Sequence, residues 1–592
     1  MKKRTLALLL ASALTLGLLA GCGGGDSNSD STPSGGETTP VSEGGETLAA
    51  DQTLQLHWAA ENFYSFDNNA NYAAEEIQVQ SHVLEGLVRP TTDEEGNQIL
   101  QPAGAESWET SEDGLVWTFH LREYYWTDGV QVTAQHFVDS FRRLADPRNA
   151  FDFASFVGDI VGGTELYTMD ASTASDAEID AAMEALAVKA VDDTTLEVTL
   201  TAPSPQFLSK VAATFMYPVR LDVIEAAGEL YDTDYTTHVW CGPFVVTGFM
   251  KDNSITLEKN ETYWDAENVK LTKVSLINID EVSTQNTMFK NHELAVIQPT
   301  GDYVQPYRDG AESGDYTFVQ TPAPGVSYFY FNRGGNSTSG LMESQKVRLA
   351  LSLAINREEF AQVIFDRNYA AYGFVPYGVQ NGDAVYRDDI TEPLKATFDE
   401  YALDNEKIQA LFKEGMEELG DTRELSEVTL TYICTGDTAI KRQQQEYWKN
   451  AWETALGITV EVNVLGDSSL FREEREAGRY DIGQASWNGD YNDPMAFLDM
   501  WTTSGTSIRY SGWTEEKALE FEAIFNPLKT EADTAKREEI FAACEQWVVL
   551  DEVAAIPYMY SDKIICVNNN VKGMTFPFVG AAYDFSRAYV VE

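Results

Sequence analysis

Residues 480–494 read Tyr-Asp-Ile-Gly-Gln-Ala-Ser-Trp-Asn-Gly-Asp-Tyr-Asn-Asp-Pro and change from apolar to polar along their length. The segment follows a helix-like run over 470–477, opens as a short strand and ends in a turn at Asn488-Gly489. Trp487 and Asp490 stand three residues apart at the end of that strand. The spacing alone favours an aspartate that stays at the surface as a turn former, but the carboxylate can also face a cleft and meet a cation.

The first 50 residues have the pattern of an export signal followed by a tether. Met1-Lys-Lys-Arg is basic, and the apolar run over 6–20, about 15 residues, is shorter than the roughly 20 of a spanning helix. The small residues before Cys22 resemble a bacterial lipobox, which implies that 1–21 is a lipoprotein signal peptide and that Cys22 is acylated. An ordinary signal peptide is the alternative. Residues 22–50 are rich in Gly, Ser and Glu and predict a flexible tether.

The composition beyond the tether predicts a large globular protein with an acidic surface. About 540 residues exceed one ordinary core, so two or three lobes are expected. Hydrophobic residues make up 43% of the chain, and 94 Asp and Glu against 41 Lys and Arg give a net charge of −53. Such a surface repels nucleic acids and anionic lipid, so nucleic-acid binding is not expected.

Cysteine and histidine usage argues against a metal site. The cysteines after Cys22 have no CxxC spacing, so zinc is not expected, and plain buried thiols are favoured over one or two disulfides. The chain lacks HExxH, GxSxG and GxxxxGK[ST] motifs, and its carboxylates are too numerous for one acid–base pair to stand out. We therefore expect no enzyme, no metal and no cofactor, with a peptidase as the enzyme alternative. The four cysteines are Cys241, Cys434, Cys544 and Cys566.

Hydrophobic periodicity predicts alternating strands and helices, which indicates the α/β class. The predicted strands are 54–58, 115–121, 196–200, 457–464 and 555–560. The predicted helices are 73–84, a helix capped by Thr133, 347–357, 358–364 opened by Asn356 with Glu359, 403–419, 440–456 and 534–550.

Several short segments occur in an order that resembles a known family. They are Glu85-Gly-Leu, Ala105-Glu-Ser-Trp108, Asp113-Gly-Leu-Val-Trp-Thr-Phe-His-Leu-Arg122, Trp126-Thr-Asp-Gly129, Val132-Thr-Ala134, Ala145-Asp-Pro147 and Val347-Arg-Leu-Ala-Leu-Ser-Leu-Ala-Ile-Asn-Arg357. Together with Trp487-Asn-Gly-Asp490-Tyr-Asn-Asp-Pro494 they resemble the solute-binding proteins of peptide ABC transporters, extracellular solute-binding protein family 5, oligopeptide-binding type. Two departures are Cys241, where the family usually has Asn, and the Asn-His-Glu-Leu-Ala of 291–295.

The resemblance covers 51–592 and implies a two-lobed, periplasmic-binding-protein-like clamp of three domains. It implies a discontinuous domain I over 51–84, 215–305 and 555–592. Domain II would be 85–214 and domain III 306–554. Alternating strands and helices agree with this α/β class, but they do not by themselves give this topology.

The resemblance also implies how cargo is held. In the family the first Asp of the motif receives the α-ammonium of a peptide, and Asp490 matches it. Backbone groups of two flanking segments would pair with the peptide as an added strand, and cargo side chains would lie in wet pockets near Trp487 and Phe153. The matching flanking residues are Tyr72, Ala73, Ala74, Ser486, Trp487 and Asn488.

The resemblance does not single out one residue that binds the cargo carboxylate. Some family members carry a basic residue where this chain has Gln484, while Arg475 and the pair Lys441-Arg442 lie near other anchor positions. For Lys441-Arg442 a solvated helix face is slightly favoured. The absence of a fixed anchor would permit longer peptides.

The resemblance implies a lipid-anchored protein on the outer face of the bacterial cytoplasmic membrane that delivers oligopeptides to the permease and ATPase subunits of an ABC importer. We expect a monomer that meets the membrane only through lipid at Cys22. The alternatives are the same fold binding a nickel chelate, haem or an oligosaccharide, and an adhesion or signalling lipoprotein that does not transport.

Overall fold

The computed structural model describes residues 47–93, 96–334, 337–365, 369–436, 438–505 and 513–592. Residues 49–592 are one unit of the chain. The predicted signal peptide, Cys22 and nearly all of the predicted tether lie outside the described residues. Within the described ranges, no helix combines the length and apolar character that crossing a membrane requires.

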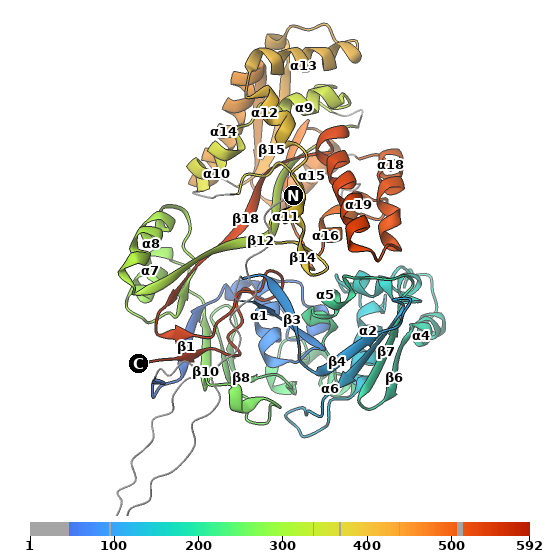
Figure 1. The fold of residues 1–592 in the computed structure, drawn as a ribbon, viewed down its shortest axis with the longest axis vertical. Coiled ribbons are helices and arrows are strands. Elements are labelled where there is room, and N and C mark those ends of the chain that lie inside the picture. The colour runs from blue at the N-terminus through green and yellow to red at the C-terminus, as the bar shows by residue number, and fades with distance from the viewer. Residues whose placement is uncertain (1–46, 94–95, 335–336, 366–368, 437, 506–512) are drawn as a thin grey trace, which may run out of the picture. The chain divides into compact units, whose positions relative to one another are not determined.

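A six-stranded mixed sheet has the strand order β11-β18-β12-β17-β15-β16. Its strands are β11 (Val296–Ile297), β12 (Tyr316–Phe331), β15 (Thr429–Thr435), β16 (Thr459–Leu465), β17 (Ile482–Asn488) and β18 (Ala555–Asn568). The antiparallel strands β12 and β18 are 16 and 14 residues long. One end of this strand pair lies beside β11 and the other end lies beside β17 (Figure 1). The strands predicted over 457–464 and 555–560 are confirmed, but β18 continues eight residues past its predicted end, to Asn568.

Two four-stranded sheets form the opposite part of this unit (Figure 1). One has the order β1-β10-β9-β8 and the other β4-β5-β7-β6. The first contains β1 (Thr53–His57), β8 (Phe244–Met250), β9 (Ser254–Lys259) and β10 (Lys273–Ile277); the second contains β4 (Ala105–Thr110), β5 (Val116–Leu121), β6 (Val188–Asp192) and β7 (Thr195–Thr199). Helix α1 (Ala74–Val83) packs against β8, and α2 (Ala134–Ala145) packs against β6 and β7 because Phe137 and Phe141 lie on its buried face.

Most helices of the second half lie at the sheet end that carries β15 and β16, and the last two pack against each other beside it (Figure 1). They are α9 (Gln345–Leu353), α10 (Arg357–Phe365), α12 (Lys395–Tyr401), α13 (Asn405–Glu418), α14 (Ala439–Leu456), α15 (Ser468–Ala477), α18 (Glu515–Phe525) and α19 (Thr534–Gln546). Glu359 N–H donates to Asn356 Oδ1 over 3.1 Å, which confirms the predicted cap of α10. The helix predicted over 534–550 changes at Trp547 into a wider π-type turn, Trp547–Asp551.

Shorter elements complete the described chain. Its two-stranded pairs are β2 (Val88–Thr92) with β3 (Gln98–Pro102), β13 (Gln380–Asn381) with β14 (Ala384–Val385), and β19 (Val571–Lys572) with β20 (Tyr589–Val590). The short helices are α3 (Gly163–Tyr167), α4 (Asp176–Ala185), α5 (Phe207–Val211), α6 (Leu221–Ala227), α7 (Val282–Lys290), α8 (Val304–Gly310), α11 (Tyr386–Asp389) and α16 (Met495–Leu498).

The ladder between β12 and β18 is interrupted between Pro322 and Val326. Proline has no N–H to donate to a ladder, so the sequence Pro-Ala-Pro-Gly over 322–325 explains the interruption. At Gly325 the chain passes so close to its neighbours that a Cβ would lie 2.6 Å from Asn488 Oδ1 and nearer still to Ser561 Oγ. A side chain at this position would therefore displace Asn488 and Ser561 where β12 runs between β17 and β18.

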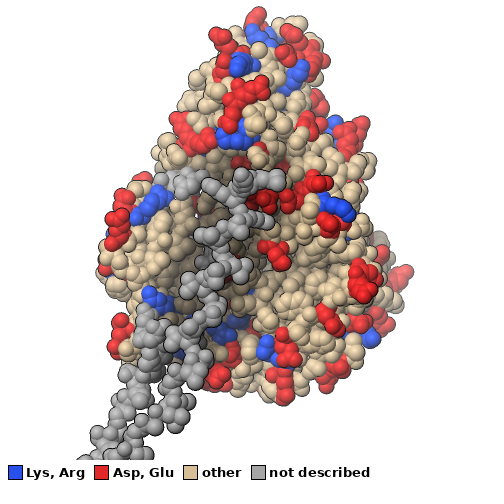
Figure 2. Space-filling view, in the orientation of Figure 1, with Lys and Arg blue, Asp and Glu red and all other residues tan. Residues whose placement is uncertain are grey.

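The acidic surface and the buried cysteines agree with what the composition predicts. Figure 2 shows acidic side chains spread over the visible face, with basic ones among them. The four described cysteines are buried and free, which confirms the prediction of plain thiols.

Candidate functional site

A cavity of about 370 Å³ lies where elements distant in the sequence meet. Its size falls in the range of small-ligand pockets. Its walls come from α1, the segment around α5, the proline-interrupted part of β12, the end of β17 and the chain after β18. Of the residues predicted for the site, this cavity brings together Ala74, Phe153, Asn488 and Asp490.

Asp490 is the second residue after the end of β17, so the strand positions its carboxylate at the cavity wall. The side chain is accessible from the cavity but surrounded by protein on its other sides, and this burial raises the pKa of its carboxyl to about 6. No described residue makes a hydrogen bond or an ion pair with this carboxylate. A cation entering the cavity would therefore be stabilised beside Asp490.

The second carboxylate of the cavity is already satisfied. Asp584 Oδ1 lies 3.2 Å from His82 Nε2. Burial alone would raise the pKa of Asp584, but the hydrogen bond from His82 and the charge of Arg89 lower it below its ordinary value. The contrast with Asp490 indicates which of the two carboxylates is open to a ligand.

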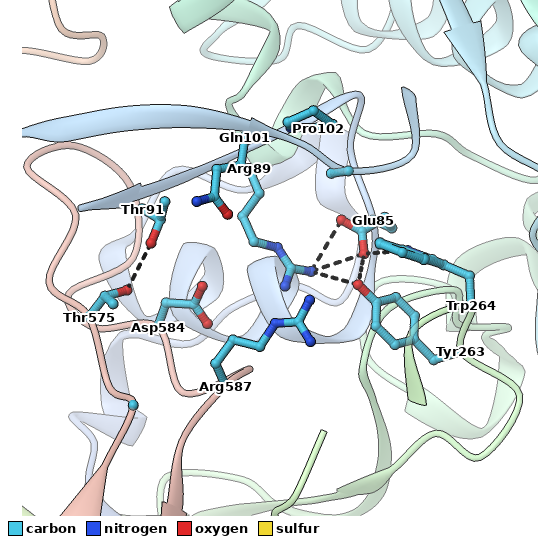
Figure 3. A pocket seen from close by; sticks show the side chains of 12 residues that line it. Glu85, Arg89, Thr91, Gln101, Pro102, Tyr263, Trp264, Thr575, Asp584 and Arg587 are labelled. Carbon is cyan, nitrogen blue, oxygen red and sulfur yellow. Dashed lines mark hydrogen bonds and ion pairs between the residues drawn. The ribbon is translucent and has the colours of Figure 1, made fainter. Parts of the chain in front are cut away.

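Arg89 lines the larger cavity and also a smaller cavity of about 60 Å³, drawn in Figure 3, where it is paired. Its Nη2 donates to both carboxylate oxygens of Glu85, at 3.0 and 3.1 Å. Tyr263 Oη also donates to Glu85, and Thr91 Oγ1 donates to Thr575 Oγ1 across the cavity (Figure 3). The bond between Thr91 and Thr575 ties β2 to the C-terminal segment, and Glu85 holds the guanidinium of Arg89.

Strand β17 has an unused backbone edge next to Asp490. Its residues 482–488 pair with β12 along their whole length, whereas β15 pairs only with Ile482 and Gly483. Within the described residues, the edge over 484–488 on the β15 side therefore has no strand partner. Ser486 and Asn488 are exposed. An extended chain can add to such an edge through main-chain hydrogen bonds.

The other predicted backbone segment is held by a buried glutamate. The N–H groups of Tyr72 and Ala73 donate to Glu76 Oε2 at 2.8 and 3.0 Å. Glu76 Oε1 accepts from Tyr64 and Ser65 N–H. Two of the amides expected to pair with cargo are thus occupied in this structure. Of the polar backbone groups in 72–74, the Tyr72 carbonyl and the Ala74 N–H remain for a ligand.

The remaining predicted residues lie around the cavity or away from it. Phe153 stacks on Phe215 with ring centroids 4.3 Å apart, and both line the cavity. Trp487 is half-buried outside the lining, and its Nε1 donates to the Ala496 carbonyl over 2.6 Å. Arg475 lies on α15 beside Tyr330, outside the cavity lining.

Gln484 occupies the position where, by the resemblance, some family members carry a basic residue, and both ends of its amide form hydrogen bonds. Its Oε1 accepts from Tyr432 Oη over 2.6 Å, and its Nε2 donates to Tyr558 Oη over 2.5 Å. This uncharged side chain therefore offers no cation to a carboxylate in this structure.

Lys563 and the segment 577–582 line the cavity without having been predicted. The sequence carries one signal for the lysine, since Ser561-Asp562-Lys563 interrupts an otherwise apolar strand. The segment after β18 has no comparable pattern. The described residues contain no cluster of three or more His, Cys, Asp or Glu side chains able to hold a metal ion.

The sequence is similar to a known family and to proteins of known function. The model of "Bacterial extracellular solute-binding proteins, family 5 Middle" matches residues 100–508. A dipeptide-binding protein of Bacillus subtilis, DppE, is 29% identical over 87% of this chain and 88% of its own length. The oligopeptide-binding protein OppA of the same organism is 28% identical over 100% of both chains.

The fold is also that of a solved structure. The substrate-binding domain of an oligopeptide ABC transporter from Bacillus anthracis superposes with a TM-score of 0.71 at 26% identity, over 92% of this chain and 100% of that one. The predicted α/β, two-lobed clamp is thereby confirmed. The chain belongs to the bacterial extracellular solute-binding proteins of family 5.

Proposed function

We propose that this chain captures oligopeptides in the cavity beside β17 and presents them to the permease and ATPase subunits of an ABC importer. The observation that carries the proposal is the carboxylate of Asp490, which lines the cavity without a cation from the described residues. An α-ammonium is the cation that every unblocked peptide carries. The names of the relatives, which bind dipeptides or oligopeptides, agree with this choice of cargo.

The peptide backbone adds to the free edge of β17 over 484–488. Such pairing gives affinity without selecting side chains, as a carrier of many peptides requires. The Tyr72 carbonyl and the Ala74 N–H complete the pairing from the opposite wall. Phe153 contacts a cargo side chain, while Trp487 stiffens the turn through its bond to Ala496. Arg475 is not among the residues that line the cavity, so in this arrangement it is not the principal anchor.

The domain and membrane assignments belong to the same proposal. Domain I comprises 51–84, 215–305 and 555–592, domain II 85–214 and domain III 306–554. The pairing of β11 with β18 supports joining 215–305 to the C-terminal segment.

Residues 1–21 are a signal peptide, and lipid on Cys22 holds a monomer at the outer face of the cytoplasmic membrane. The protein is not an enzyme.

Mass spectrometry of bound cargo tests the proposal. The full chain, purified in mild detergent, is denatured with acid, and released molecules are identified. The expected result is a series of short peptides that is absent from Asp490→Asn and retained by Asp383→Asn, which removes an exposed carboxylate in the β13–β14 turn. A single non-peptide solute, or an empty protein that ignores added peptide mixtures, would contradict it.

A further inference from the structure

Four charged side chains line the cavity, and two of them have a partner. Arg89 pairs with Glu85, and Asp584 pairs with His82. The other two are Asp490 and Lys563, and no described residue of opposite charge forms an ion pair with either. The cavity therefore offers one negative and one positive group to its cargo.

Lys563 is held in place without being neutralised. It lies in β18 opposite Thr321 of β12, just before the interruption of the ladder. Its Nζ donates to the carbonyl oxygens of Pro577 at 2.6 Å and Phe578 at 3.3 Å. An ammonium has three hydrogens. Two are used by these carbonyls, so the third remains for a ligand in the cavity.

The neighbouring carboxylate of Asp562 serves a different contact. Successive side chains of a strand point to opposite faces of the sheet. Asp562 Oδ2 accepts from Gln320 Nε2 over 2.7 Å. Burial lowers the pKa of the Lys563 ammonium to about 8, and no described carboxylate forms an ion pair with it. A carboxylate supplied by cargo would offset this cost, because an opposite charge favours the ionised form.

We infer that Lys563 binds a carboxylate of the peptide whose ammonium Asp490 binds. The inference rests on the proposed function and adds selectivity to it. A peptide offers this chemistry at its C-terminus and on Asp or Glu side chains. A short peptide reaches Lys563 with its terminus, and a longer one reaches it with an acidic side chain. The carboxylate anchor that the neutral Gln484 does not provide is thus supplied from β18.

Pairs of peptides that differ in a single carboxylate distinguish binding of the C-terminus from binding of an acidic side chain. The full chain in detergent is offered equimolar mixtures of alanine peptides of graded length, and bound peptides are quantified by mass spectrometry. One set of pairs differs by Glu or Gln at a single position, and the other by a free or an amidated C-terminus. Wild type, Lys563→Met, Lys563→Arg and the control Lys572→Met on β19 are compared.

In wild type we expect at least one pair to favour the carboxylate member by about 30-fold, as the loss of a desolvated ion pair implies. The set that shows the preference identifies the source of the carboxylate. Lys563→Met should bring the ratio close to one, whereas Lys563→Arg and Lys572→Met should preserve it. A purely structural role of Lys563, through Pro577 and Phe578, would weaken both members of a pair equally.

Two outcomes overturn the inference while leaving the proposed function intact: peptides bind wild type without preference, or Lys563→Met keeps the wild-type ratio. Failure of wild type to bind any peptide overturns the proposed function as well. The thermal midpoint of each variant is measured alongside, and Lys563→Arg reports on the site if Lys563→Met fails to fold.

Discussion

Arg537 Nη2 and Asp493 Oδ2 lie 2.6 Å apart, and both side chains are almost fully buried. Asp493 belongs to the turn that carries Asp490, and Arg537 belongs to α19. Asp493 Oδ1 also accepts from Met495 N–H over 2.9 Å, so one carboxylate fastens both the turn and the start of α16. The ion pair between Asp493 and Arg537 therefore helps to hold the turn in which Asp490 lies.

Breaking this pair should destabilise the protein strongly. Arg537→Met leaves the Asp493 carboxylate buried without its cation, which typically costs about 3–5 kcal/mol. We expect a matching fall in the free energy of unfolding measured with urea. The neighbouring Lys536→Met removes an exposed cation 3.5 Å from Glu531 and should change stability by about 0.5 kcal/mol or less. Equal effects of the two variants would refute the structural role.

Removal of the Asp490 carboxylate should weaken binding. Asp490→Asn keeps the size of the side chain but removes the charge that pairs with an α-ammonium, and the loss of such a pair costs about 2–5 kcal/mol. Isothermal titration with an unblocked peptide should show this loss, while an N-acetylated peptide should bind wild type and the variant with similar affinity. A variant that discriminates between the two peptides as wild type does would argue against ammonium recognition.

The affinity of wild type for such a peptide should depend on pH around 6. The pKa of Asp490 in the empty cavity is about 6, so the carboxylate is ionised above this pH and protonated below it. For a peptide without His, Asp or Glu, affinity should fall about tenfold per pH unit below 6. Asp490→Asn should remove this step.

A second buried acid needs its own control in that experiment. Burial raises the pKa of Asp499 to about 7, and Lys210 and Asp490 face it with opposite effects. Lys210 is in turn paired with Asp159 at 2.9 Å. Asp499→Asn should therefore retain the loss of affinity below pH 6. If it abolishes that loss and Asp490→Asn does not, Asp499 is the titrating group.

The raised pKa of Asp490 also has a consequence for the empty protein. The folded chain holds a proton on Asp490 up to about pH 6, whereas the ordinary value of 3.8 applies when the chain is unfolded. Protonation is thus favoured by folding, and this contribution to stability is lost as the pH rises from about 4 to above 6. Relative to Asp490→Asn, empty wild type should lose stability over this interval in urea titrations. A constant difference between the two would contradict the shift.

A methyl group at Gly325 should disturb both the ladder and the site. Gly325→Ala places a Cβ 2.6 Å from Asn488 Oδ1 and even nearer to Ser561 Oγ. Overpacking of this kind costs about 1–3 kcal/mol. Peptide affinity should also fall, because Asn488 lines the cavity. At Gly248 a Cβ would meet Thr256 at an ordinary 3.6 Å, so Gly248→Ala serves as the control.

Local hydrophobic periodicity is sufficient to predict the main helices and the short strands. The helices predicted over 403–419 and 440–456 appear as Asn405–Glu418 and Ala439–Leu456. The long strand Tyr316–Phe331 was not predicted because Pro322 and Pro324 break its pattern, and only the flanking strands hold it extended. Tertiary pairing overrides local propensity at this strand.

The candidate site was predicted in part, through the resemblance of residues 487–494 to a family motif and not through periodicity. A local motif drew attention to Asp490, and the structure brings it together with Ala74, Phe153 and Asn488. The occupation of the Tyr72 and Ala73 amides by Glu76, and the approach of Lys563, depend on contacts between distant segments. No periodicity records such contacts, so these features required the structure.

The four backbone hydrogen bonds to Glu76 have a consequence for how the two loops that contain residues 64–65 and 72–73 can vary in sequence. One carboxylate holds both loops by their main chains, so the loop conformation does not depend on which side chains they carry. Tyr64 and Tyr72, stacked 5.3 Å apart and each about half exposed, project from those loops. Substitutions at these two positions can change what the outer surface contacts at little structural cost, so long as Glu76 is retained. Variation between relatives is therefore expected at the tyrosines and constraint at the glutamate.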